Sequence, residues 1–93
     1  MNPDHVAITG ASSGIGEHLA IAYAAPGRRL SLAARRGVRL EAVAQRCRAL
    51  GADAAIAELD VRDDVAVAQW FAAVDALQPV DLVIANAGVF DGN

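Results

Sequence analysis

The stretch Thr9-Gly10-Ala11-Ser12-Ser13-Gly14-Ile15-Gly16 decides the fold, because it separates an apolar run from a segment with helical periodicity. The apolar run, His5–Thr9, predicts a buried strand that stops at Gly10. Residues 14–25 predict a helix, since Ile15, Leu19 and Ala22 fall on one face. A glycine-rich turn between a strand and a helix is where open parallel sheets bind their ligands.

The three glycines of this turn each meet a different physical need. Gly10 lets the chain turn sharply out of the strand, and Gly14 removes a side chain where a phosphate would approach the backbone. Gly16 allows the helix and the strand to pack closely. The amides of residues 13–15 then face the ligand from a helix N-terminus, whose dipole favours anions. The hydroxyls of Ser12 and Ser13 add donors, and the absence of a Gly-Lys pair argues against an ATP-binding P-loop.

The rest of the chain alternates strands and helices. Further strands are predicted at Leu30–Ala34, Ala54–Leu59 and Val80–Ala85, with a helix at Gly37–Leu50. A third helix is capped by Asp63 or Asp64, carries Val67, Trp70, Phe71, Val74 and Leu77 on its apolar face, and closes at Pro79; residues 86–93 form a loop. Such alternation predicts an α/β fold with about four parallel strands in the order 3-2-1-4 and three helices. This is the N-terminal half of a Rossmann-type, doubly wound sheet.

Length and composition narrow the function. A chain of 93 residues makes one domain, so residues 1–93 are expected to be a partial nucleotide-binding domain. The net charge of −3 gives no electrostatic footprint for nucleic acid, and no apolar stretch is long enough for a membrane span. A single cysteine, Cys47, makes neither an internal disulfide nor a zinc site and is expected in the core. With no secretory leader visible, a cytoplasmic location is the expectation.

Three motifs together resemble those of the short-chain dehydrogenase/reductase family. Thr9–Gly16 looks like its Thr-Gly-x-x-x-Gly-x-Gly signature, Leu59-Asp60-Val61 like its aspartate motif after the third strand, and Ala85-Asn86-Ala87-Gly88 like its Asn-Asn-Ala-Gly motif. Ala85 departs from that pattern, which leaves the contribution of the first asparagine side chain in doubt.

The resemblance implies an oxidoreductase that binds a nicotinamide dinucleotide. Asp60 would accept a hydrogen bond from the adenine amino group, and the Val61 backbone would lie beside the ring. Asn86, Ala87 and Gly88 would line the floor beneath the ribose and the nicotinamide side. The remaining residues of the implied site hold the pyrophosphate and ribose; they are Gly10, Ser12, Ser13, Gly14, Ile15 and Gly16.

The end of the second strand favours NADP(H) over NAD(H). An acidic residue there would bind both ribose hydroxyls and repel a 2′-phosphate, but the position is filled by Ala34. Arg35 and Arg36 follow, and guanidinium groups bind phosphate through paired, charge-assisted hydrogen bonds. Arg35 is the expected main contact and Arg36 its support; solvated surface charges are the alternative interpretation.

The resemblance also implies what these residues lack. The family's Tyr-x-x-x-Lys pair and its serine follow the fourth strand, whereas this chain contains no lysine and its one tyrosine, Tyr23, lies on the first helix. No catalytic residue is therefore assigned, and the 93 residues alone are expected to be a truncated, inactive part of the enzyme. His18 and His5 are interpreted as surface or half-buried residues without a catalytic role.

Several questions stay open at this level. The parent enzyme is expected to be a homo-oligomer acting on a small carbonyl or alcohol substrate, which the sequence does not identify. The fourth strand would lie at a sheet edge, which favours pairing with more chain or a second copy. One alternative is a non-catalytic dinucleotide-binding or interaction module. Another is a methyltransferase, but Ala34-Arg35-Arg36 argues against it because an acidic residue is expected there.

Overall fold

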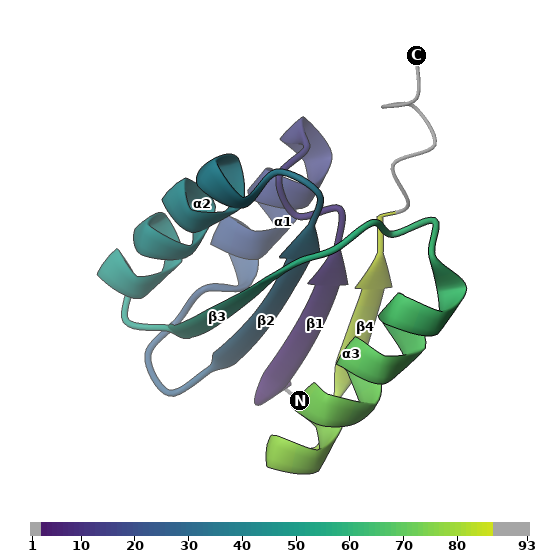
Figure 1. Cartoon of the computed structure of the whole chain (residues 1–93). Helices are drawn as coiled ribbons and strands as arrows, with labels where there is room; N and C mark the ends of the chain where they lie inside the picture. The colour runs from purple at the N-terminus through teal and green to yellow at the C-terminus, as the bar shows by residue number, and fades with distance from the viewer. Residues whose placement is uncertain (1–2, 87–93) are drawn as a thin grey trace.

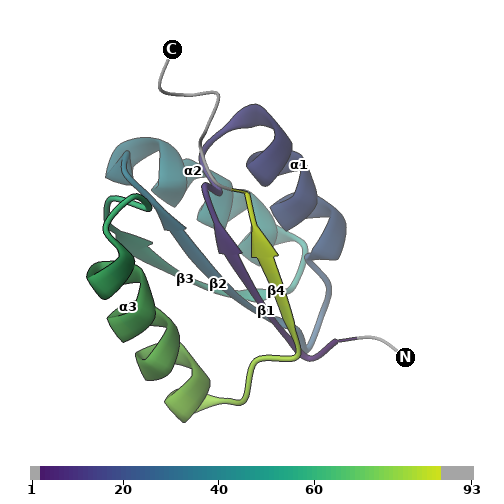
Figure 2. The same ribbon diagram turned by 90° about the vertical axis from the view of Figure 1, so that its right-hand side faces the viewer.

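The computed structural model describes residues 3–86 and confirms the predicted architecture. All strand pairs are parallel, and the order across the sheet is β3-β2-β1-β4 (Figure 1). Helices α1 and α2 cover one face and α3 the other (Figure 2). The elements are β1 His5–Thr9, α1 Gly14–Tyr23, β2 Arg29–Ala34, α2 Gly37–Ala49, β3 Asp53–Glu58, α3 Asp64–Leu77 and β4 Leu82–Ala85.

The core lies between the sheet and the α1–α2 layer. Strand residues alternate between the two faces, so Val6 and Ile8 of β1 and Leu30 and Leu32 of β2 point to the same side, where all are fully buried. Helix α2 adds four buried residues, Leu40, Val43, Ala44 and Cys47. The prediction that Cys47 is a core residue is thus confirmed, and burial raises the pKa of its thiol.

Two predicted boundaries are wrong by two residues, the others by one at most, and polar contacts explain the two larger differences. Helix α1 ends at Tyr23, where the backbone carbonyl accepts a 2.6 Å hydrogen bond from the Arg28 guanidinium, so Pro26-Gly27 belongs to the following turn. Strand β4 starts at Leu82 because Val80 donates its amide to the Asp75 carboxylate at 2.8 Å. The loop between α3 and β4 is thus held by side chains before strand pairing begins.

His5 is buried, contrary to the expectation of a surface or half-buried residue. Its ring nitrogens lie 2.7 Å from the Gln78 carbonyl oxygen and 2.7 Å from the Ser31 hydroxyl. Because a carbonyl only accepts, Nδ1 carries the hydrogen toward Gln78. The Asp81 carboxylate, just before β4, accepts hydrogen bonds from the backbone amides of Asp4 and His5 in the same region. These hydrogen bonds connect β1, β2 and the end of α3 near the amino-terminal ends of the strands, away from the glycine-rich turn.

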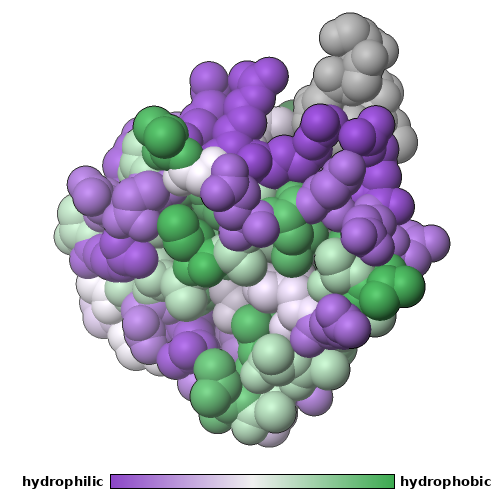
Figure 3. Space-filling model, in the orientation of Figure 1, coloured by the Kyte–Doolittle hydropathy of each residue, from purple (hydrophilic) through white to green (hydrophobic). Residues whose placement is uncertain are grey.

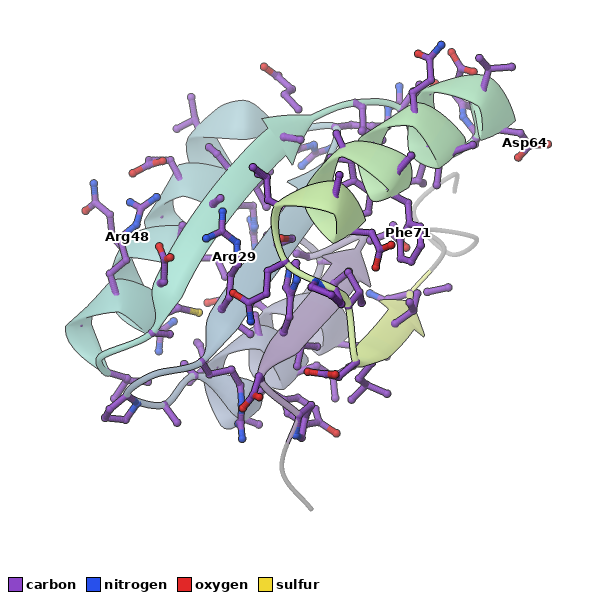
Figure 4. All side chains as sticks on the ribbon, turned by 90° about the horizontal axis from the view of Figure 1, so that it is seen from below. Arg29, Arg48, Asp64 and Phe71 are labelled. Carbon is purple, nitrogen blue, oxygen red and sulfur yellow. The ribbon has the colours of Figure 1, made fainter. Side chains whose placement is uncertain are left out.

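Helix α3 packs less closely than its sequence predicts. Trp70 and Phe71 belong to the apolar face, which predicts burial in the core, but both are only half-buried and no residue of α3 is buried. Figure 4 labels Phe71 on the side of the helix toward the sheet. On the opposite face α1 and α2 flank each other, whereas α3 has no neighbouring helix among residues 3–86. Apolar patches consequently stay visible on this side (Figure 3), and Leu77 is 73% exposed.

We expect α3 to open before the rest of the fold. Few buried apolar contacts mean a small free energy for local opening. In native-state hydrogen exchange, amides of α3 should therefore exchange faster than those of α2, which has four buried residues in a helix of similar length. Equal protection of the two helices would contradict this expectation.

None of the helices within residues 3–86 is long and apolar enough to cross a membrane.

Candidate functional site

The glycine-rich turn leaves β1 through a left-handed residue. Gly10 has φ +70°, a backbone conformation that residues other than glycine rarely adopt. Its amide donates to the Ala33 carbonyl of β2 at 2.8 Å, and the Ala11 amide donates to the same oxygen at 3.2 Å. The turn is thus anchored to the neighbouring strand, and it lies at the carboxyl ends of β1 and β2, at the upper edge of the sheet in Figure 1.

Ser13 organises the turn with its hydroxyl. The hydroxyl donates to the Gly10 carbonyl at 3.0 Å and accepts from the Gly16 amide at 3.4 Å, which makes Ser13 the N-cap of α1. It also accepts from the Asn86 side chain at 2.7 Å. One donor and two acceptor positions are all that a hydroxyl has. The Ser13 hydroxyl therefore shapes the turn and has no free position left for a phosphate.

Asn86 fixes the same turn from the end of β4. Its side-chain nitrogen donates to the Gly10 carbonyl at 3.1 Å as well as to Ser13, so both amide hydrogens are used. The sequence predicted Asn86 as part of the floor of the site, and the structure places its side chain against the turn. Ala87 and Gly88, predicted beside it, lie outside the described residues.

Gly14 and Gly16 have opposite surroundings. A Cβ atom at Gly16 would lie 2.1 Å from the Gly10 carbonyl oxygen and 2.9 Å from the Ala11 Cα. The close approach predicted at Gly16 is therefore between the helix and the turn itself. A Cβ atom at Gly14 would meet nothing within 4 Å. The backbone at Gly14 thus borders open space beside the first turn of α1.

That open space is a groove of about 510 Å³. One wall is the glycine-rich turn, and the other is the start of α2 with the end of β2. Arginines line the second wall, and no acidic side chain lines the groove among the described residues. The lining residues are Gly10, Ser12, Ser13, Gly14, Ala34, Arg35, Arg36, Arg39 and Val61.

The structure brings most of the predicted site residues to one place. Arg35 and Arg36 are exposed and reach the groove from the loop after β2, as Val61 does from the loop after β3. Gly16 and Asn86 do not line the groove but contact the backbone of the turn, Gly16 by close packing and Asn86 by a hydrogen bond to the Gly10 carbonyl. Ile15 is 63% exposed and does not line the groove, and Asp60 lies next to Val61 just outside it.

Arg39 is a groove residue that the sequence reasoning missed. Its Nε donates to the Ser12 carbonyl at 2.9 Å, so it links α2 to the glycine-rich turn. The signal that could have found it is its place in the first turn of the helix that follows Arg35 and Arg36, since α2 begins at Gly37 and a basic side chain there stays beside that loop. The groove therefore carries three guanidinium groups.

Asp60 is held by a neighbouring arginine. Arg62 donates from its backbone amide and Nε to Oδ1 and from Nη2 to Oδ2, at 2.9, 3.1 and 3.0 Å. These bonds to Arg62, with the positive charge of Arg35 adding to them, lower the pKa of Asp60 to about 2. Because the folded state lowers this pKa, the pair stabilises the fold above the ordinary pKa of aspartate, and its contribution is lost as the pH falls through about 2.

Within residues 3–86, no three His, Cys, Asp or Glu side chains gather as metal ligands.

Comparison with known proteins places this groove in a family. Residues 4–93 match the short chain dehydrogenase family. The chain belongs to that family. A curated relative, the 11-beta-hydroxysteroid dehydrogenase-like 4A of Arabidopsis thaliana, is 56% identical over 68 residues, which are 72% of this chain and 21% of that protein.

Two solved structures share the fold. A metagenomic short-chain oxidoreductase crystallised in complex with NADP has a TM-score of 0.82 and 35% identity, over 92% of this chain and 40% of that chain. An NAD⁺-bound xylitol dehydrogenase has a TM-score of 0.78 and 25% identity, over 86% of this chain and 32% of that chain. The predicted family and the Rossmann-like fold are therefore confirmed, and this chain spans less than half the length of these proteins.

Proposed function

We propose that residues 1–93 form the nucleotide-binding part of an NADP(H)-dependent oxidoreductase. The observation that carries the proposal is the groove in which open backbone at Gly14 faces three arginines. The family supports a nicotinamide dinucleotide in general, and the solved structures similar to this chain include one with NADP and one with NAD⁺. The choice between the two cofactors therefore rests on this chain's own residues.

The turn fits a pyrophosphate by the chemistry of its donors. Ser13 takes up the Gly16 amide, whereas the amides of Gly14 and Ile15, at the start of α1, have no partner within the helix. These two amides, at the positive end of the helix dipole, would hold the pyrophosphate. Gly10 and Gly16 keep the backbone in place, and Ser13 and Asn86 lock it by side-chain hydrogen bonds.

The arginine wall fits a 2′-phosphate. Ala34 is buried and uncharged at the end of β2, so no carboxylate there would repel a phosphate or pair with the ribose hydroxyls. Arg35 would bind the phosphate with Arg36 in support, and Arg39 would hold the two walls of the groove at a fixed distance through Ser12. Asp60 and Val61 would receive the adenine at the groove's outer end.

The dinucleotide would supply hydride exchange with a carbonyl or alcohol group when bound. Residues 3–86 would bind and orient it, because their polar groups converge on the phosphate and adenine ends of the groove. The substrate class of small carbonyls or alcohols, the homo-oligomeric state of the parent enzyme and the cytoplasmic location stay predictions from the sequence.

Calorimetric titration with NADPH and NADH tests the proposal. We expect NADPH to bind at least about tenfold more tightly, because one charge-assisted arginine–phosphate contact is worth about 1.5–3 kcal/mol. The difference should shrink in high salt, since exposed charges are screened. NADH binding as tightly as NADPH would contradict the cofactor choice, and failure of both to bind would contradict the function.

A further inference from the structure

The Asp60–Arg62 pair is joined by three hydrogen bonds, whereas each of the three other ion pairs among residues 3–86 is joined by one. The three hydrogen bonds from Arg62 fix both carboxylate oxygens, two of them arriving at Oδ1 and one at Oδ2. The Asp63 amide also donates to the Asp60 carbonyl at 2.9 Å, and the Asp63 side chain in turn caps α3. The turn is therefore fixed on both sides of Arg62, and the plane of the Asp60 carboxylate is set by it.

This arrangement leaves few acceptor positions on Asp60. A carboxylate has about four lone-pair positions, two on each oxygen. Arg62 occupies both positions on Oδ1 and one on Oδ2, which leaves one on Oδ2. The carboxylate stays ionised near neutral pH, since Arg62 and then Arg35 hold its pKa at about 2. Asp60 thus presents a single, oriented acceptor and no donor.

A single fixed acceptor discriminates between purines by the group at their 6-position. Adenine carries an amino group there, which donates a hydrogen bond. Hypoxanthine carries an oxygen there, which accepts, so two acceptors would face each other. The hypoxanthine analogue therefore loses the hydrogen bond to the carboxylate and brings two acceptors together, which weakens its binding.

We propose that Arg62 is a positioning residue that holds the Asp60 carboxylate for the 6-amino group of adenine and thereby makes the groove selective against 6-oxopurine dinucleotides. This rests on the proposed function, because it assumes that the groove binds a dinucleotide. Arg62 itself is not a groove-lining residue and acts through Asp60.

The test compares Arg62→Gln with the wild-type protein, using NADPH and its hypoxanthine analogue as the two ligands in calorimetry. We expect the wild type to prefer NADPH by about tenfold or more. In Arg62→Gln the affinity for NADPH should fall about five- to tenfold, while that for the hypoxanthine analogue stays within about twofold. Arg46→Gln is the matched control, because it removes another exposed arginine–carboxylate pair, with Glu17, away from the groove and should change neither affinity.

Two further measurements separate orientation from charge and from folding. Arg62→Lys keeps the positive charge but loses the planar fork, so it should also lose most of the discrimination. An NMR titration of the Asp60 carboxyl should give a pKa of about 2 in the wild type and a higher value in Arg62→Gln. Cooperative thermal melts with midpoints well above the titration temperature would show that both variants fold.

Failure of the role proposed for Arg62 and failure of the proposed function give different results in these titrations. Equal affinity of the wild type for the two ligands, or full discrimination in either Arg62 variant, would overturn the role of Arg62 and leave the dinucleotide site standing. Binding of neither ligand by the wild type would overturn the proposed function instead.

Discussion

Gly16→Ala is expected to lower the free energy of unfolding by about 3 kcal/mol, the upper part of the usual range for overpacking. The added methyl group would lie 2.1 Å from the Gly10 carbonyl oxygen and 2.9 Å from the Ala11 Cα. Both are backbone atoms, and Gly10 is fixed by hydrogen bonds to Ala33 and Asn86, so neither side of the clash can move away cheaply. Urea denaturation followed by circular dichroism, without any ligand, measures the loss.

Gly14→Ala is the matched control, two residues earlier on the same helix. Its methyl group meets nothing within 4 Å, so stability should change by less than about 0.5 kcal/mol. The same methyl group would enter the groove, where we expect it to lower NADPH affinity at least about tenfold by blocking the approach of a phosphate to the backbone. If Gly14→Ala bound NADPH normally, the phosphates would not lie against this turn.

Arg35→Ala is expected to weaken NADPH binding by about 10- to 100-fold and to leave NADH binding within about twofold. The reason is that Arg35 would contact only the 2′-phosphate, which NADH lacks. The side chain is exposed at the mouth of the groove, so its removal should not disturb packing. Calorimetric titration of both cofactors at one fixed salt concentration measures the change.

Arg36→Ala and Arg46→Ala provide the comparison for Arg35. Arg36 also lines the groove and should show a smaller loss of NADPH affinity, whereas Arg46 lies outside it and should show none. An equal fall for NADPH and NADH in Arg35→Ala would mean that Arg35 holds a part common to both cofactors. That outcome would remove the basis for an NADP(H) preference.

Much of the fold could be predicted from the sequence because its signals are local. The strand β1 matches its predicted range, and the positive φ angle of Gly10 occurs at the predicted sharp turn. Asp63 caps α3 as its position before the apolar face suggested. The parallel order follows from these units, since right-handed crossovers leave few arrangements.

The features that could not be predicted depend on contacts between distant residues. The buried state of His5 depends on Ser31 and on the carbonyl of Gln78, 73 residues away along the chain. Asn86 reaches Gly10 across 76 residues, and no local pattern shows that its side chain holds the turn. Trp70 and Phe71 lie on an apolar helix face, but how far such a face is buried depends on the neighbours beside the helix.

The central claim, that one groove holds a dinucleotide, is tested most directly by a two-dimensional amide NMR titration with NADPH. We predict that the largest shifts fall on the turn from Gly10 to Gly16, on Arg35 and Arg36, and on Asp60 and Val61, with small changes in α3. Saturable shifts at these three segments would support the site. Absence of shifts at the turn, or shifts confined to α3 and the sheet face beneath it, would contradict it.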